Sequence, residues 1–342
     1  MRYRILGNTG VSISVIGFGA SPLGNVFGTI SSSSDSVLID AAIDKGINFF
    51  DVSPYYGLGL AEERLGTALT PHRQEVVLAT KCGRCDVDDF DFSAGGITSR
   101  LEASLRRLRT DAVDLLQLHD IEFGDVKQVI HEALPALAEL KRQGKARFIG
   151  ITGYWSGLLA GVVQSFPLDT VLNYCRWNLF ADDMDIRLTP VAKANGVGLI
   201  NASPLHMGLI GSSIPDWHPA PQSVRVAAAD VKSACQKREV DPATVAVWRC
   251  LQHPMVASTL VGMADVSQVA SSCTALEFQP DDDLLATITE AISPVYNTVW
   301  SQGRPQNQDG VFDRSLIFMD HDEAADQYGS SATVESTLGC WE

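Results

Sequence analysis

Short apolar runs alternate with stretches of helical periodicity along most of this chain, and this alternation constrains the fold more than any other feature. About eight runs have the length and composition of buried strands: 15–19, 48–51, 75–80, 113–118, 146–151, 170–174, 197–202 and 258–261. Helical patterns lie between them, near 34–46, 61–69, 98–108, 126–142, 155–165, 185–194, 224–237 and 242–252, with another from about 266. This repeat predicts an α/β fold with a parallel sheet, and ~250 residues of it predict a closed (β/α)8 TIM barrel.

The first residues do not follow this rhythm. Residues 2–14 alternate around Gly7-Asn8-Thr9-Gly10, which predicts an N-terminal β-hairpin. A doubly wound open sheet is the rival fold, and it requires a glycine-rich phosphate-binding turn after its first strand. The stretch Gly17-Phe18-Gly19-Ala20-Ser21-Pro22 lacks the third glycine, and its proline interrupts helix entry, so we reject the rival.

The end of the chain differs in composition. Residues 301–342 contain eight acidic residues against two basic ones and few apolar residues outside 311–319. We therefore expect residues 1–300 to form the barrel and residues 301–342 to be an acidic, mostly flexible C-terminal tail, in which 311–319 could dock on the barrel.

Charge restricts the partners of this protein. Its net charge of −15 repels nucleic acid and anionic lipid, so we expect neither nucleic acid nor membrane as a partner. The net charge does not exclude an anionic cofactor, because helix N-termini bind phosphate whatever the net charge. The uncharged residues 5–34 are interrupted by glycines and Pro22, and no signal peptide precedes them, so we expect a cytoplasmic protein.

The cysteines fit a reducing compartment. There are seven, an odd number, and most lie in apolar runs, which favours free thiols. Cys82 and Cys85 form a CxxC sequence without a second pair, so a structural role is favoured over redox or zinc chemistry, and no metal is expected.

Four polar residues stand at or just beyond the ends of successive apolar runs: Asp51, Tyr56, Lys81 and His119. The C-terminal ends of barrel strands meet at one face, where barrel active sites lie. Each residue alone is more often a solvated or packing group, but their joint placement favours one shared site.

These four side chains suit proton transfer between an alcohol and a carbonyl. A lysine beside a tyrosine is expected to lower the phenol pKa, a carboxylate holds the lysine, and a histidine orients the substrate oxygen. No protein side chain accepts hydride, so redox chemistry requires a nicotinamide cofactor.

Longer motifs in the chain resemble those of a known protein superfamily. Asp51-x4-Tyr56-Gly57, Lys81 after a strand and His119 closing another strand resemble the aldo-keto reductase superfamily over about residues 1–300. The opening 6–10 and the stretch 144–150 also match that superfamily. The chain is similar in particular to its L-galactose dehydrogenase branch, through the stretches 17–24, 48–57, 81–84, 90–93, 119–124 and 215–219.

The resemblance implies roles for individual residues. Tyr56 is the general acid/base, tuned by Lys81 and Asp51, and Tyr56, His119 and Asp120 contact the substrate. The implied cofactor-binding residues are Gly19, Ala20, Thr152, Gly153, Asn173, Ser203, Pro204, Leu205, Gly262, Met263, Ala264, Gln268 and Ser272. The chain departs from many members at Thr152-Gly153, where they have Ser-Asn, at Asn173, where they have Gln, and at Ser271-Ser272, where they have an acidic residue and Asn.

The cofactor is expected to be NAD rather than NADP. Residues 251–276 contain no Lys or Arg for the extra phosphate of NADP, and Asp265 adds a negative charge. The alternative is a cation from Lys232, Lys237 or Arg238 on the preceding helix.

The sequence thus predicts NAD-dependent oxidation of the C1 hydroxyl of an L-galactose-like aldose to the lactone, by a monomer or weak homodimer. The first alternative is a relative acting on L-fucose, D-arabinose or another small aldehyde. A non-catalytic, nucleotide-binding regulatory protein is the second alternative. The presence of all four residues of the tetrad, Asp51, Tyr56, Lys81 and His119, argues against it.

Overall fold

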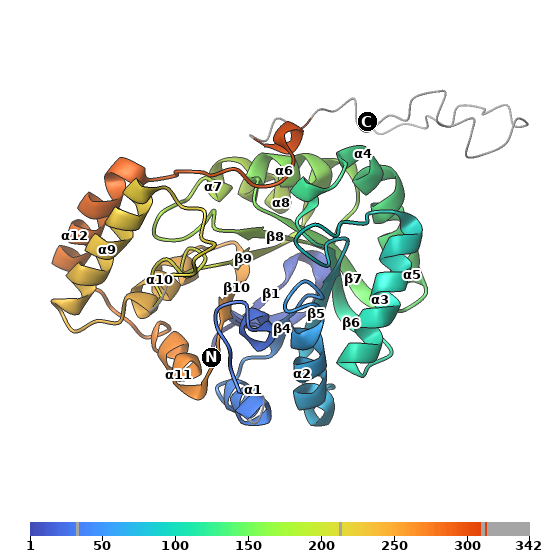
Figure 1. Ribbon diagram of the computed structural model, residues 1–342, viewed down its shortest axis with the longest axis horizontal. Coiled ribbons are helices and arrows are strands. Elements are labelled where there is room, and N and C mark those ends of the chain that lie inside the picture. The colour runs from blue at the N-terminus through green and yellow to red at the C-terminus, as the bar shows by residue number, and fades with distance from the viewer. Residues whose placement is uncertain (32–33, 212–213, 309–311, 313–342) are drawn as a thin grey trace, which may run out of the picture.

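The strands form a closed parallel barrel, as predicted. The computed structural model describes residues 1–31, 34–211, 214–308 and 312 (Figure 1). Within these ranges the barrel order is β10-β3-β4-β5-β6-β7-β8-β9. The barrel strands are β3 (Ile16–Gly19), β4 (Phe49–Asp51), β5 (Val77–Cys82), β6 (Val113–Leu118), β7 (Ala146–Gly153), β8 (Thr170–Tyr174), β9 (Gly198–Ala202) and β10 (Val256–Gly262).

Helices surround the strands as an outer ring (Figure 1). They are α1 (Asp35–Asp44), α2 (Leu60–Leu69), α3 (Ala94–Leu108), α4 (Val126–Gln128), α5 (Leu134–Arg142), α6 (Ser156–Ser165), α7 (Met184–Arg187), α8 (Thr189–Asn195), α9 (Gln222–Gln236), α10 (Pro242–Leu251), α11 (Val266–Thr274) and α12 (Asp282–Ile292). Among the described residues, none of the helices combines the length and apolar character needed to cross a bilayer.

Three helical segments differ from the prediction. Helix α3 begins four residues early because the Ser93 hydroxyl accepts a hydrogen bond from the Gly96 amide and caps it. The helix expected over 126–142 contains a π-helical segment, Val129–Ala133, between α4 and α5. The helix expected over 185–194 is divided into α7 and α8, and Pro190 occupies the first turn of α8.

The barrel interior is apolar at one end and polar at the other. The predicted hairpin, β1 (Tyr3–Ile5) and β2 (Ser12–Ser14), is present and pairs antiparallel. Its Leu6 and Ile13 pack with interior residues such as Phe49, Ala79 and Leu115. The hairpin therefore closes the N-terminal end of the barrel. Side chains alternate along a strand, so the inward positions two residues later, at the C-terminal end, are Asp51, Lys81 and Gln117.

The chain beyond α12 returns to the barrel. The indole Nε1 of Trp155 donates to the carbonyl of Gln302 at 2.8 Å. The side chain of Asn307, 7% exposed, donates to the carbonyls of Glu122 and Gly124 at 2.8 and 2.9 Å. Residues 301–308, assigned to the tail from their composition, are thus held against the loops after β6 and β7.

One residue further along is also described. Phe312 packs so close to helix α6 that a Cβ on Gly161 would lie 2.0 Å from its ring. The rest of the predicted flexible tail lies outside the described residues.

Candidate active site

The structure brings the four tetrad residues together. Asp51 ends β4, Lys81 lies near the end of β5, and His119 directly follows β6. The Lys81 ammonium donates to the Asp51 carboxylate and, at 3.0 Å, to the Val52 carbonyl. Its Nζ lies 3.5 Å from the Tyr56 hydroxyl oxygen. The rings of Tyr56 and His119 meet edge to face, with centroids 5.8 Å apart. The arrangement can hold a proton on Tyr56 beside a fixed positive charge.

Two further side chains hold the tetrad in place, and the sequence did not reveal them. The Gln117 amide donates to the second carboxylate oxygen of Asp51 at 3.0 Å. The hydroxyl of Ser53 lies 2.9 Å from Nδ1 of His119. Gln117 could have been recognised as a polar inward position on an apolar strand, two residues after Leu115.

The turn that carries Tyr56 packs directly on the loop after β3. A Cβ on Gly24 would lie 2.4 Å from the main chain of Tyr56, and a Cβ on Gly57 would lie 2.5 Å from the Gly24 carbonyl oxygen. Gly57 also has φ +66°, a conformation that L side chains rarely adopt. These two glycines therefore allow the close approach that fixes the position of Tyr56.

Burial controls the protonation of the tetrad. Burial raises the pKa of Tyr56 to about 12, and the attraction of Lys81 only partly opposes it. Lys81 lowers the pKa of Tyr56, as expected, but burial outweighs this effect, so the net shift is upward. Burial also lowers the pKa of His119 to about 3. At neutral pH Tyr56 is protonated and His119 is neutral.

Asp120 lies beside the tetrad, as its predicted contact with substrate requires. Its Oδ2 is 3.7 Å from Nε2 of His119 and accepts a hydrogen bond from Arg84 at 2.6 Å. Its main-chain amide donates to the Thr152 hydroxyl at 2.9 Å. Arg84 is a third residue of this site, after Gln117 and Ser53, that the sequence did not indicate.

Glu122 is a buried acid close to these residues. Its Oε1 accepts hydrogen bonds from the Tyr154 amide at 2.9 Å and the Tyr174 hydroxyl at 3.1 Å. The other carboxyl oxygen is buried without a partner among the described residues. Burial, reinforced by Asp120, raises the pKa of Glu122 to about 8.

Several predicted cofactor residues lie at neighbouring strand ends. Gly19 pairs in register with Gly262 on one side and Asp51 on the other. The positions that follow β3, β9 and β10 at this end of the barrel are Ala20, Ser203, Pro204, Leu205, Met263 and Ala264. A Cβ on Gly19 would be 3.2 Å from the Val261 carbonyl oxygen, so strand pairing here is close. A nicotinamide cofactor that acted at the tetrad would be held by residues at these neighbouring strand ends.

The predicted residues on α11 lie next to this edge. Asp265 caps α11, because its carboxylate accepts from the Gln268 amide at 2.9 Å. The side-chain oxygen of Gln268 in turn accepts from the Ala264 amide at 2.8 Å. Ser272 is buried on the same helix, with 8% of its surface exposed.

Thr152 and Asn173 already have partners within the protein. The Thr152 hydroxyl accepts a hydrogen bond from the Asp120 amide. The Asn173 amide nitrogen donates to the carbonyls of Gly153 and Tyr154 at 2.8 and 3.0 Å. The Asn173 oxygen accepts from Ser156. A cofactor contact by Asn173 would require it to exchange these partners.

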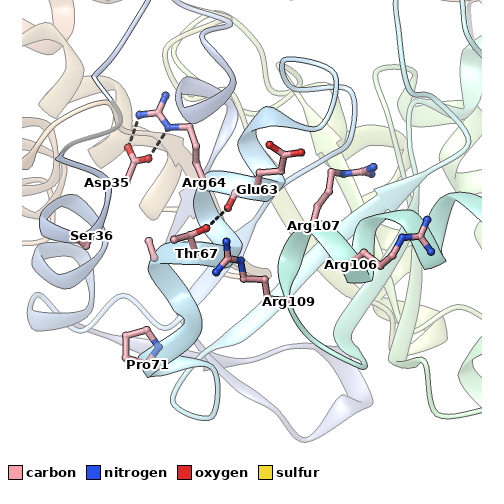
Figure 2. Close-up of a pocket in the computed structure, with 10 residues that line it drawn as sticks. Asp35, Ser36, Glu63, Arg64, Thr67, Pro71, Arg106, Arg107 and Arg109 are labelled. Atoms are coloured by element: carbon pink, nitrogen blue, oxygen red, sulfur yellow. Dashed lines mark hydrogen bonds and ion pairs between the residues drawn. The ribbon is translucent and has the colours of Figure 1, made fainter.

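A separate hollow of about 710 Å³ lies on the helical ring between α1, α2 and α3 (Figure 2). It is rich in arginine, but Arg64 is paired with Asp35 and Arg107 with Glu62. None of its lining residues belongs to the tetrad. The chemistry described above therefore belongs to the barrel end rather than to this hollow.

The barrel and its tetrad define an oxidoreductase, and the chain belongs to the aldo/keto reductase family, whose model matches residues 15–293. It is 40% identical to L-galactose dehydrogenase of Arabidopsis thaliana over 315 residues, which cover 89% of this chain and 98% of that protein. It is 29% identical to D-threo-aldose 1-dehydrogenase of Pseudomonas sp over 82% of this chain and 95% of that protein.

A solved structure agrees in fold. The holo form of an aldo-keto reductase from Bacillus halodurans superposes with a TM-score of 0.71 at 24% identity, covering 90% of this chain and 100% of that chain. The superfamily predicted from the motifs is confirmed. Members of the family use a nicotinamide cofactor.

Proposed function

We propose that this protein is a NAD-dependent dehydrogenase that oxidises the C1 hydroxyl of an L-galactose-like aldose to the aldonolactone. The observation that carries this proposal is the Tyr56 hydroxyl, 3.5 Å from the Lys81 ammonium and edge to face with a neutral His119. The 40% identity to L-galactose dehydrogenase supports an aldose as the substrate.

In this proposal Tyr56 removes the proton of the C1 hydroxyl. Lys81 stabilises the phenolate form of Tyr56 that accepts this proton, and Asp51 and the Val52 carbonyl hold the ammonium in place. A bound nicotinamide supplies the acceptor for the hydride that leaves C1. In the opposite direction the protonated Tyr56 is the general acid.

His119 orients the reacting oxygen. The Ser53 hydroxyl oxygen accepts the Tyr55 amide at 3.1 Å, so its hydrogen is free to donate to Nδ1 of His119. We infer that the imidazole proton is on Nε2, where it can hydrogen-bond the substrate oxygen without adding a positive charge.

NAD is favoured over NADP because the N-terminus of α11 is already occupied. The Asp265 carboxylate accepts hydrogen bonds there, from the Gln268 amide at 2.9 Å and the Ser267 hydroxyl at 2.5 Å. A phosphate at this point would meet a negative charge. Of the cations on the preceding helix, Lys232 approaches the Gly211 carbonyl at 3.5 Å. Arg238, just beyond that helix, approaches Asp281 at 3.8 Å.

The test is a kinetic panel. The purified protein is assayed with NAD⁺ and NADP⁺ against L-galactose, L-fucose and D-arabinose, with Tyr56→Phe as the background control. We expect the highest kcat/KM with L-galactose and NAD⁺. Absence of turnover on every aldose, with reduction of simple aldehydes intact, would reject the dehydrogenase proposal.

The panel also covers the alternative substrates. The similarity to D-threo-aldose 1-dehydrogenase favours a wider aldose range as the second candidate function. A higher kcat/KM with L-fucose or D-arabinose than with L-galactose would select that alternative.

A further inference from the structure

We propose that Arg84 and Asp120 form a subsite that binds the hydroxyl groups of the substrate next to its reacting C1 oxygen, and that Arg84 thereby selects sugars over plain aldehydes. The identity of the substrate as an aldose rests on the function proposed above. The subsite itself is argued from the contacts of the two side chains.

Arg84 is packed among aromatic rings, and among the described residues most of its hydrogen-bonding capacity is unused. Its guanidinium carbon lies 4.1 Å from the ring centroid of Tyr55, 4.3 Å from that of Phe123 and 5.5 Å from that of Phe90. One of its five N–H groups donates to Asp120. Its Nε is buried and has no partner among the described residues. A guanidinium fixed between aromatic rings with free donors is prepared to bind oxygen atoms.

Asp120 is fixed from the opposite side. The Thr152 hydroxyl contacts its Oδ1 at 3.3 Å, and the Asp120 main chain is in the left-handed conformation, with φ +51°. Few non-glycine residues adopt this conformation, and it occurs here where the side chain must turn towards His119. The carboxylate has lone pairs left to accept a hydroxyl hydrogen.

The position of the pair relative to His119 gives the subsite its role. The chain of contacts runs from Nε2 of His119 to Asp120 at 3.7 Å and from Asp120 to Arg84 at 2.6 Å. If His119 binds the C1 oxygen, a hydroxyl on the adjacent carbon falls beside the carboxylate and guanidinium. A sugar hydroxyl both donates and accepts, so it can bond to both groups at once.

A purely structural ion pair is the opposing interpretation. It leaves unexplained why a guanidinium whose side chain is 11% exposed keeps a buried donor unpaired, because buried polar groups are normally satisfied. A site built to hydrogen-bond hydroxyls discriminates strongly against analogues that lack them. The two interpretations therefore differ in their effect on substrate selection.

The experiment compares Arg84→Met, Arg84→Lys and the matched surface variant Arg142→Met in the full-length protein. Arg142 lies on the exposed surface, paired with Glu139, and is remote from the tetrad in sequence and contacts. Each protein is assayed for L-galactose oxidation and for reduction of D-glyceraldehyde and propanal. Of these two aldehydes, only glyceraldehyde carries hydroxyl groups. NADH affinity is measured by fluorescence titration.

For Arg84→Met we expect kcat/KM for L-galactose and glyceraldehyde to fall at least about 100-fold, mainly through KM. Propanal reduction and NADH affinity should stay within about threefold of wild type. Arg84→Lys should lose part of the preference for glyceraldehyde over propanal, and Arg142→Met should lose none of it. Equal losses of kcat/KM on propanal and glyceraldehyde in Arg84→Met, or an unchanged preference for glyceraldehyde in Arg84→Lys, would overturn the subsite.

The aldehyde pair separates this proposal from the function proposed above. If wild type oxidises no aldose, the dehydrogenase proposal fails, yet the ratio of glyceraldehyde to propanal activity still tests Arg84. If L-galactose is oxidised and Arg84→Met keeps wild-type preference, the subsite alone is wrong.

Discussion

Replacing Glu122 by Gln should stabilise the protein increasingly as the pH rises. Glu122 is fully buried, and its unpartnered Oε2 lies where a Cβ on Gly153 would come within 2.6 Å. Gln keeps the oxygen that accepts from Tyr154 and Tyr174, and its amide group has the size of the protonated carboxyl. The variant therefore imitates the neutral form of the acid.

The sign and size of the effect follow from the pKa of Glu122. Burial raises it from 4.5 to about 8 in the folded protein, so the folded state binds the proton more tightly than the unfolded state. The stability that this proton contributes is fully present below pH 4.5 and is lost as the pH rises through 8. A shift of this size corresponds to an upper limit on the order of 5 kcal/mol. Gln does not titrate and escapes this loss.

Thermal unfolding from pH 5 to pH 9 measures the difference. The melting temperature of Glu122→Gln minus that of wild type should grow by several degrees over this range, at roughly 1–2 °C per kcal/mol for a chain of this size. Glu290→Gln, on the exposed face of α12, makes the same chemical change at the surface and is the reference for it. A difference for Glu122→Gln that stays constant from pH 5 to pH 9 would refute the buried neutral carboxyl.

Four other outcomes are expected. Tyr56→Phe should lower turnover ~10²–10⁴-fold or more and leave NADH affinity, measured by fluorescence, nearly unchanged. Because burial raises the pKa of Tyr56 to about 12 and Tyr56 is protonated at neutral pH, kcat/KM for aldose oxidation at saturating NAD⁺ should rise with pH above 7; a flat profile from pH 6 to pH 9 would contradict this. Ending the chain at Ser301 removes the hydrogen bonds of Gln302 and Asn307, each worth about 1 kcal/mol, and should lower the melting temperature by a few degrees. An unchanged melting temperature would show that residues 302–308 do not contribute to stability. Wild type should have at least tenfold higher kcat/KM with NAD⁺ than with NADP⁺, and Asp265→Ser should narrow that ratio; equal values for the two cofactors in wild type would reject the argument from α11.

The order of strands and helices could be predicted because each element carries its own pattern. Apolar runs bounded by turn residues mark all eight barrel strands, and the hairpin is marked by its glycines. Helix α12 was not predicted, although Leu284, Ile288 and Ile292 form a buried stripe and the Asp281 carboxylate caps its first turn. The signal was present in the sequence, but it lies beyond the last strand, where the alternation no longer indicates a helix.

The residues of the tetrad could be predicted to lie together because strand ends in a parallel barrel share one face. Their supporting contacts could not, since these depend on the register between strands. Gln117 reaches Asp51 because β6 pairs with β5 so that Gln117 stands opposite Lys81. Likewise, the sequence contains nothing that places Asn307 on the loop after β6.

The pKa of Tyr56 also could not be predicted from the sequence, and it bears on the direction of the reaction. The sequence identifies Lys81 as a neighbour but not the degree of burial, and burial is the larger effect. The tyrosine is protonated at pH 7, which is the form that reduction requires. Oxidation requires the phenolate, and a pKa of about 12 makes it costly by on the order of 7 kcal/mol at pH 7. Lys81 already acts on the phenol in the protein, so a lower pKa needs further positive charge near the phenol or another hydrogen bond to the phenolate. An oxidised nicotinamide carries such a charge and a reduced one does not. We therefore expect the protonation of Tyr56 to follow the redox state of the cofactor, so that the same residue can serve as base in one direction and acid in the other.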